Sequence, residues 1–168
     1  MHRNELGASL IELIMILVIS GLLATMAARR VLRDASKTQQ KNAARTALRD
    51  FTYARNQAMI HGRAVAIKIN IRENHYTVKW AASGEYLENP VAGGPFIRQF
   101  GNDEFLHVRI TDTGLANDKL IFLASGRPAS EAGNLIAMTT AIAFNGGHRV
   151  VVVPYTGRLK LVLNPTDD

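Results

Sequence analysis

A single stretch near the start of the chain limits what the sequence can fold into. Residues 8–28 (ASLIELIMILVISGLLATMAA) form an apolar run of 21 residues that carries one charge, Glu12. A helix needs about 20 apolar residues to cross the hydrocarbon core of a bilayer, and the run meets that length. An ionisable side chain in such a helix is costly unless it finds a partner, and no Lys or Arg lies within the run. The sequence therefore predicts a membrane-length helix in which Glu12 meets a group from another chain or lies among solvated headgroups.

Two other interpretations of the run remain open. A cleaved secretory signal has a basic start, a shorter apolar core and a small-residue cleavage site, which Thr25-Met26-Ala27 imitates loosely. The run is also compatible with a buried core helix of a soluble protein. Its length, the single basic residue before it (Arg3) and the carboxylate inside it favour a retained helix.

The residues around Glu12 resemble a known leader motif. Residues 7–13 (GASLIEL) are similar to the type IV prepilin leader, usually written GFTLIEL, with Ala8 in place of the usual Phe. The resemblance implies that a prepilin peptidase cuts after Gly7 and methylates the new N-terminus at Ala8. It also implies that Glu12 meets the N-terminal amine of a neighbouring subunit in a filament. That amine would be the partner that the carboxylate needs.

The rest of the chain predicts an α+β fold. Residues 31–60 contain no Gly or Pro and show apolar side chains at helical spacing, so we expect one helix from about residue 8 to 60, stopped at Gly62. The apolar period then changes to two, which indicates antiparallel strands. The expected strands are 64–71, 75–82, a short one at 96–100 inside a variable loop, 105–111, 119–124, 135–144, 148–153 and 158–163. Asn145-Gly146-Gly147 is a strong hairpin signal.

This pattern is similar to the GspH/FimT group of minor pilins. Residues 44–67 look like the helix-to-strand region of that group, and residues 150–161 (VVVVPYTGRLKL) look like its terminal hairpin. The resemblance implies a pilin-like arrangement, in which a long helix packs on an antiparallel β domain. The expected parts are a leader peptide at 1–7, a transmembrane and filament-core helix at 8–28, its amphipathic continuation at 29–61, and a periplasmic β domain at 62–168.

Basic residues are concentrated just after the apolar run. Residues 29–79 contain 12 Lys or Arg and 3 Asp or Glu, whereas residues 80–168 contain 7 and 9. Such a zone suits anionic lipid or another polyanion, or is simply a solvated helix surface. The positive-inside tendency would place the C-terminal domain in the cytoplasm. The leader motif implies the periplasm, and we follow the motif because its own machinery recognises and assembles a prepilin.

No pattern in the sequence predicts catalysis or metal binding. The chain has no Cys, and its five histidines (His2, His61, His75, His107 and His148) stand at no metal-ligand spacing. We expect these histidines at the surface or at strand edges. There is no nucleophile elbow and no phosphate-binding glycine loop. We therefore expect a protein that is not an enzyme and that uses no metal or cofactor.

Two functions follow from the resemblance. The first is a structural minor pseudopilin of the type II secretion pseudopilus, which supports protein secretion and is anchored in the inner membrane by a single span. Its partners would be other pilins and the prepilin peptidase. The alternative is a FimT-like minor type IV pilin that binds DNA for uptake in natural transformation.

The alternative depends on a basic motif near the C-terminus. Some FimT-type proteins bind DNA through Gly-Arg-x-Arg, and this chain has Gly157-Arg158-Leu159-Lys160. Arg158 and Lys160 are two residues apart on an expected strand, so both project from one face, and we expect Arg149 or His148 opposite them. Phosphate contacts by such side chains would be weak, salt-sensitive and independent of sequence. Two polar residues on the solvent face of an edge strand would give the same pattern without DNA.

Overall fold

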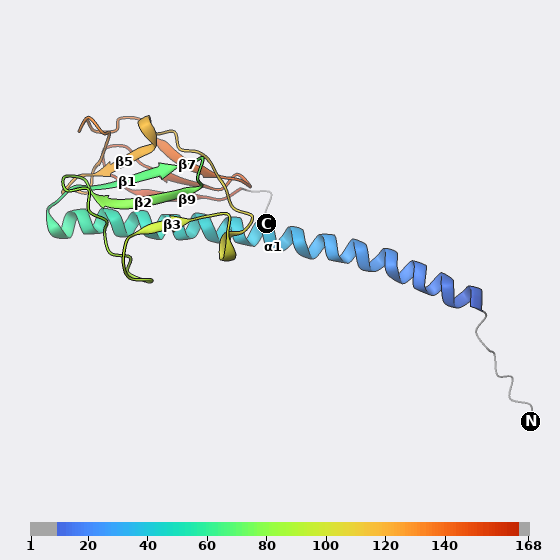
Figure 1. Cartoon of the computed structure of the whole chain (residues 1–168). Helices are drawn as coiled ribbons and strands as arrows, with labels where there is room; N and C mark the ends of the chain where they lie inside the picture. Colours follow the sequence, from blue (N-terminus) through green and yellow to red (C-terminus); the bar gives the residue numbers. More distant parts are fainter. Residues whose placement is uncertain (1–9, 165–168) are drawn as a thin grey trace, which may run out of the picture. The chain divides into compact units, whose positions relative to one another are not determined.

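The chain divides into two units, Met1–Ser36 and Lys37–Asp168, and one long helix, α1 (Leu10–His61), has residues in both (Figure 1). The computed structural model describes residues 10–164, except for the side chains of 27–33. The leader peptide expected at 1–7 and the start of the expected span therefore lie outside the described residues.

The second unit contains two antiparallel sheets. Their strand orders are β3-β2-β1-β5-β6 and β4-β7-β8-β9. The strands of the first sheet are β1 (Val65–Asn70), β2 (His75–Trp80), β3 (Ile97–Gln99), β5 (Lys119–Phe122) and β6 (Pro128–Ala129). Those of the second are β4 (Ile110–Asp112), β7 (Thr140–Phe144), β8 (Arg149–Val152) and β9 (Leu159–Val162). Two short 3-10 helices, η1 (Asp103–Phe105) and η2 (Ala116–Asp118), lie in the connections. The α+β fold class is thereby confirmed.

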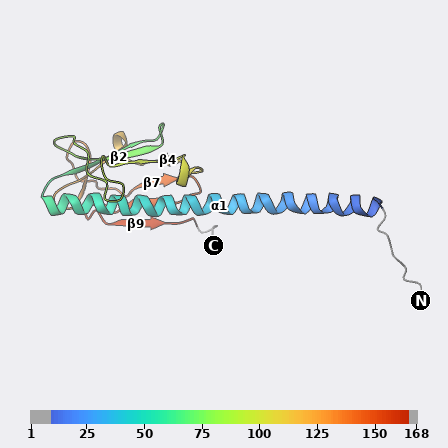
Figure 2. The ribbon, with the colours of Figure 1, turned by 60° about the horizontal axis from the view of Figure 1, so that its bottom comes forward.

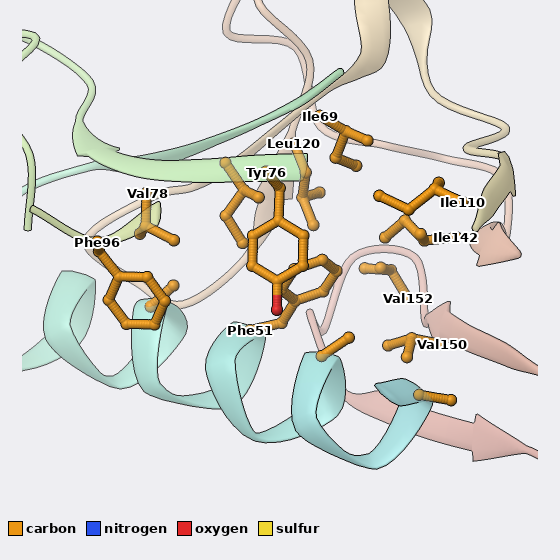
Figure 3. Close-up of a cluster of buried hydrophobic side chains, with 14 of the residues drawn as sticks. Phe51, Ile69, Tyr76, Val78, Phe96, Ile110, Leu120, Ile142, Val150 and Val152 are labelled. Carbon is orange, nitrogen blue, oxygen red and sulfur yellow. The ribbon is translucent and has the colours of Figure 1, made fainter. Parts of the chain in front are cut away.

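The part of α1 that belongs to the second unit packs through small side chains. Its buried face repeats every three or four residues, as a helix that covers a core requires, and consists of Ala43, Ala44, Ala47, Phe51, Ala54 and Ala58. Because alanine ends at Cβ, the helix backbone can approach the sheets closely. Phe51 is the large member of this face, and its ring meets the Tyr76 ring edge-on at a centroid distance of 5.2 Å (Figure 3).

Both sheets contribute side chains to one continuous core beneath this helix face. Figure 2 shows the strands gathered along the C-terminal part of α1, with β9 on one side of the helix in that view and β2 on the other. From the first sheet come Val65, Ile67, Ile69, Tyr76, Val78, Leu120 and Phe122. From the second come Ile110, Ile142, Val150 and Val152, which Figure 3 labels, and also Phe144. The strand alternation predicted from the sequence therefore matches a sheet that is buried on one face.

The helix ends where the sequence predicts. Gly62 has φ of 62°, the left-handed conformation that favours glycine just after a helix. The backbone N–H of Arg63 then donates to the carbonyl of Ala58 at 3.1 Å, which satisfies one of the last carbonyls of α1.

Several predicted strands are confirmed. β1 and β2 pair as a hairpin in which Ile67 faces Val78, and β7 and β8 flank the predicted turn at 145–147. The short strand expected within 96–100 is β3. The last strand, β9, lies within the predicted 158–163.

Two predicted strands are largely wrong. Of residues 105–111, only the end joins β4. Phe105 and Val108 are buried, but in a turn closed by a hydrogen bond from the N–H of Val108 to the carbonyl of Phe105 at 3.0 Å. Of residues 135–144, only Thr140–Phe144 form β7. The order also departs from a simple meander, because β5 pairs with β1, with Val65 facing Phe122.

Candidate functional site

The first unit presents an apolar helix surface. The large hydrophobic side chains of α1 between Leu10 and Met26 are each at least half exposed, and they occur on all sides of the helix. Their exposure ranges from 50% at Ile14 to 78% at Leu10. A contiguous apolar surface of this kind is not stable in water on its own and indicates a membrane or a protein partner.

Glu12 lies within this surface, in the first turn of α1, with an exposed side chain. A carboxylate near a helix N-terminus is favoured by the backbone N–H groups that point toward that end. Gly7 and Ala8, the expected cleavage and methylation positions, lie outside the described residues. Among the residues whose side chains are described, no helical segment has the length and hydropathy of a membrane span.

The basic motif near the C-terminus begins in a tightly packed turn. Gly157 has φ of 67°, and a Cβ at this position would overlap the carbonyl oxygen of Gly126. Glycine is therefore required here both for its backbone conformation and for the close approach of a second turn. The sequence pattern Gly-Arg thus has a packing reason for its Gly that does not depend on any ligand.

Two further arginines support this turn. Arg55 of α1 donates from Nε to the carbonyl of Gly126 at 3.0 Å and from Nη2 to the carbonyl of Thr156 at 3.4 Å. Arg127 donates from Nε to the carbonyl of Tyr155 at 2.9 Å. These two arginines add positive charge to the turn beyond what its own residues supply. No sequence motif indicated this, because Arg55 and Arg127 are distant from the motif along the chain.

The three residues expected to contact DNA are all exposed. Lys160 of β9 faces Val151 of β8, and Arg149 faces Val162. Arg149 is therefore a diagonal neighbour of Lys160 on the outer face of the second sheet, whereas we expected it directly opposite. Arg158 comes just before β9, and its carbonyl accepts the N–H of Val153 at 2.8 Å.

His148 is fully buried, contrary to the expected surface position. His148 follows the turn at 145–147 and lies on the same side of the strand as Val150 and Val152, which are buried. The alternation along this segment therefore indicates a buried side chain at position 148. Its Nδ1 accepts the backbone N–H of Asn164 at 3.3 Å. His61 and His107 are exposed and His75 is half-buried. Over the described part of the chain, no group of three or more His, Asp or Glu side chains is placed to hold a metal ion.

A buried carboxylate joins α1 to the first sheet. Asp50 accepts hydrogen bonds from the Tyr76 hydroxyl and from the Arg98 guanidinium, and only 8% of Asp50 is exposed. Burial, followed by the charge and hydrogen bond of Asp50, raises the pKa of Tyr76 well above its ordinary value. Burial lowers the pKa of Arg98, but the hydrogen bond and charge of Asp50 outweigh it and raise that pKa overall. These groups fix the helix on the sheet.

The fold matches solved structures of filament subunits. A structure of the minor pseudopilin EpsH from the type 2 secretion system of Vibrio cholerae aligns with a TM-score of 0.54 at 17% identity, over 74% of this chain and 97% of that one. A second EpsH structure aligns at 0.55 and 12% identity, over 76% and 97%. The type IV minor pilin FimU of Pseudomonas aeruginosa aligns at 0.52 and 18% identity, over 78% and 92%.

The chain has the fold of minor pilins and minor pseudopilins. The pilin-like fold predicted from the leader motif and the strand pattern is thereby confirmed. All of these structures are described as pilins or pseudopilins. No known sequence family and no curated protein sequence matches the chain.

Proposed function

We propose that the chain is a minor subunit of a pilin-type filament, and that this filament is the type II secretion pseudopilus. A prepilin peptidase removes residues 1–7 and methylates Ala8. Residues 8–28 then hold the protein in the inner membrane, with the β domain in the periplasm, until the helix moves into the filament core beside other pilins.

The observation that carries this proposal is the apolar surface of α1 between Leu10 and Met26. It is exposed in the single chain, and it contains one carboxylate, Glu12. Packed helices in a filament would cover the apolar side chains, and the α-amino group of a neighbouring subunit would neutralise Glu12. A carboxylate and an ammonium group in so apolar a setting attract strongly, because little water screens them.

The test is the recovery of Glu12→Ala in filaments. We expect the variant to be cleaved and retained in the membrane, yet absent from or strongly depleted in sheared and purified filaments, as measured by immunoblot against the β domain. The matched control is Glu104→Ala, which removes an exposed carboxylate from the second unit. Recovery of Glu12→Ala at the level of the control would overturn the assembly role.

A second candidate is DNA binding for uptake. It is favoured by Arg158, Lys160 and Arg149, which are exposed along one hairpin beside a turn that Arg55 and Arg127 make still more positive. Lys160 supplies charge without the bidentate fork of arginine, so its contact with phosphate is expected to be weaker.

Titration of the full-length chain with double-stranded DNA tests this candidate. At low salt we expect weak binding that declines as salt is added. Arg158→Ala with Lys160→Ala should reduce the slope of log affinity against log salt by about 1 for each lost phosphate contact. If the double variant binds DNA as well as the unchanged chain does, these residues do not bind DNA and only the structural role is left.

A further inference from the structure

The outer face of the first sheet contains a hollow that neither candidate function uses. The hollow measures about 270 Å³ and is lined by side chains of β1, β2 and β5, among them Ala66, Lys68, Thr77, Lys79, Trp80 and Lys119. We call it the lysine hollow. Ala66, Lys68, Thr77, Lys79 and Lys119 alternate with the core residues of the same strands, so the hollow lies on the side of the sheet opposite the core. Trp80, at the end of β2, pairs with Val65 and borders the hollow from the core side.

The three lysines of the hollow share one face of the first sheet, at neighbouring positions of its register. Lys68 of β1 lies directly opposite Lys119 of β5, an arrangement of like charges that destabilises a sheet unless an anion compensates for it. Lys79 lies opposite Ala66, next to Lys68 on the same face. The Nζ of Lys68 donates to the carbonyl of Asn117 at 2.6 Å, and that of Lys79 lies 4.1 Å from the Tyr86 ring centroid. Neither contact neutralises the ammonium charge.

One carboxylate of the chain already occupies the rim of the hollow. Glu131, in the loop after β6, receives a 2.8 Å hydrogen bond from Nζ of Lys119 and a 3.1 Å hydrogen bond from the Asn117 side chain. The hydrogen bond from Lys119, then that from Asn117, lowers the pKa of Glu131. Its side chain is 51% exposed, so solvent or another acid can replace it. Glu131 therefore shows which chemical group the hollow accepts, and it balances only one of three ammonium charges.

The floor of the hollow has room and a hydroxyl group. Ala66 projects only a methyl group between the longer lysines. Thr77, whose exposed fraction is 9%, also lines the hollow. Its hydroxyl can donate a hydrogen bond to an anion held there, in addition to the ammonium groups.

We propose that the lysine hollow docks a carboxylate side chain from an acidic segment of another protein. The incoming carboxylate takes the place of Glu131 at Lys119 and is also bound by Lys68, Lys79 and the Thr77 hydroxyl. The methylene groups of a glutamate lie over Ala66. This inference does not depend on the proposed filament or DNA-binding roles.

Nucleic acid fits the hollow less well than an acidic peptide. Single strands bind proteins largely by stacking bases on aromatic rings. Trp80 is half-buried and already contacted by the Arg63 guanidinium, 4.6 Å from the ring centroid, and by the His61 ring at 5.3 Å. A carboxylate side chain can exchange with Glu131 at the rim of the hollow. A phosphate backbone is continuous and would instead have to run past the negative charge of Glu131.

The chain contains its own reporter for this site. Trp80 is the single tryptophan, so intrinsic fluorescence reports on the hollow. We would titrate the full-length chain, kept in solution with a non-ionic detergent, with an acetylated pentaglutamate peptide at low salt. We expect a saturable change in Trp80 fluorescence. Lys79→Gln with Lys119→Gln should weaken the affinity at least about tenfold, and Thr77→Val should weaken it several-fold, because each removes donors to a charged group.

Glu131→Gln gives the opposite and more specific expectation. It removes the competing carboxylate and keeps the shape of the side chain, so the pentaglutamate peptide should bind several-fold more tightly. The matched control is Arg45→Gln with Arg49→Gln, which removes two positive charges from the exposed face of α1 and should leave the affinity nearly unchanged. The thermal unfolding midpoint of each variant separates loss of binding from loss of folding.

Three results would overturn the proposal. One is equal weakening by the α1 control, which would mean non-specific attraction to a basic protein. Another is unchanged or weaker binding to Glu131→Gln. The third is tighter binding of an oligothymidylate probe with the same dependence on Lys79 and Lys119, which would mean that the hollow prefers phosphate.

Discussion

Tyr76, near the start of β2, donates a hydrogen bond to Asp50 of the helix, with 2.7 Å between the hydroxyl and Oδ2. The hydroxyl points toward α1 in Figure 3. Arg98 of β3 binds the same carboxylate, with its Nε 2.8 Å from Oδ2. One side chain of the helix thus holds two neighbouring strands of the first sheet.

Removing this carboxylate should destabilise the domain. In Asp50→Ala the Tyr76 hydroxyl and the Arg98 guanidinium lose their partner in a largely buried place, and we expect the free energy of unfolding to fall by about 3 kcal/mol. Chemical denaturation followed by circular dichroism measures the change. Arg49→Ala, at the adjacent exposed position of α1, is the control and should change stability by less than about 0.5 kcal/mol. Equal effects of the two substitutions would contradict the role assigned to Asp50.

The raised pKa of Tyr76 predicts a loss of stability at alkaline pH. The neutral phenol stabilises the fold fully below its unfolded pKa of about 10. As the pH rises above that value, the unfolded chain releases the proton while folded Tyr76 keeps it. The free energy of unfolding should therefore decline by up to about 1.4 kcal/mol per pH unit from this group.

Tyr76→Phe provides the comparison. The variant should be less stable at neutral pH, because Asp50 loses a donor, and its alkaline decline should be shallower than that of the unchanged chain. The absorbance of phenolate at each pH checks the assignment. Ionisation of Tyr76 near pH 10 in the folded protein would show that the carboxylate and burial do not control this group.

Gly157→Ala should destabilise the turn that carries Arg158. The substitution combines a left-handed backbone conformation with overlap against the Gly126 carbonyl, so we expect a loss of about 2 kcal/mol or more. Gly93→Ala isolates the first effect, because Gly93 also has positive φ but nothing lies within 4 Å of its added Cβ. Thermal unfolding midpoints compare the two. A midpoint for Gly157→Ala equal to that of Gly93→Ala would mean that the contact with Gly126 relaxes at no cost.

The sequence was sufficient for elements whose pattern is local. Helical spacing from Ala44 to Ala58, the stop at Gly62 and the Asn145-Gly146-Gly147 turn each depend on neighbours along the chain, and each was correctly located. It failed where burial comes from tertiary contacts. Phe105 and Val108 belong to an apolar segment that looks like a strand, yet they are buried from a turn, because the core receives apolar side chains from any backbone conformation that reaches it.

The same limit applies to the basic surfaces. Arg158 lies just before the last strand, whereas Lys160 could be located on that strand from the sequence. The support from Arg55 and Arg127 could not, because it depends on the contact between turns at Gly126 and Gly157. The lysine hollow likewise depends on the pairing of β1 with β5, which no sequence motif predicts.

The alanine face of α1 sets a rule for how sequences of this kind can change over time. What the sheets require from Ala43, Ala47 and Ala54 is a small volume, and other small side chains could meet that requirement. The opposite face, with Asn42, Arg45 and Arg49, has no such restriction. Substitutions can therefore accumulate over most of the helix while the docking of helix on sheet persists, so a shared fold in such chains can outlast recognisable similarity of sequence.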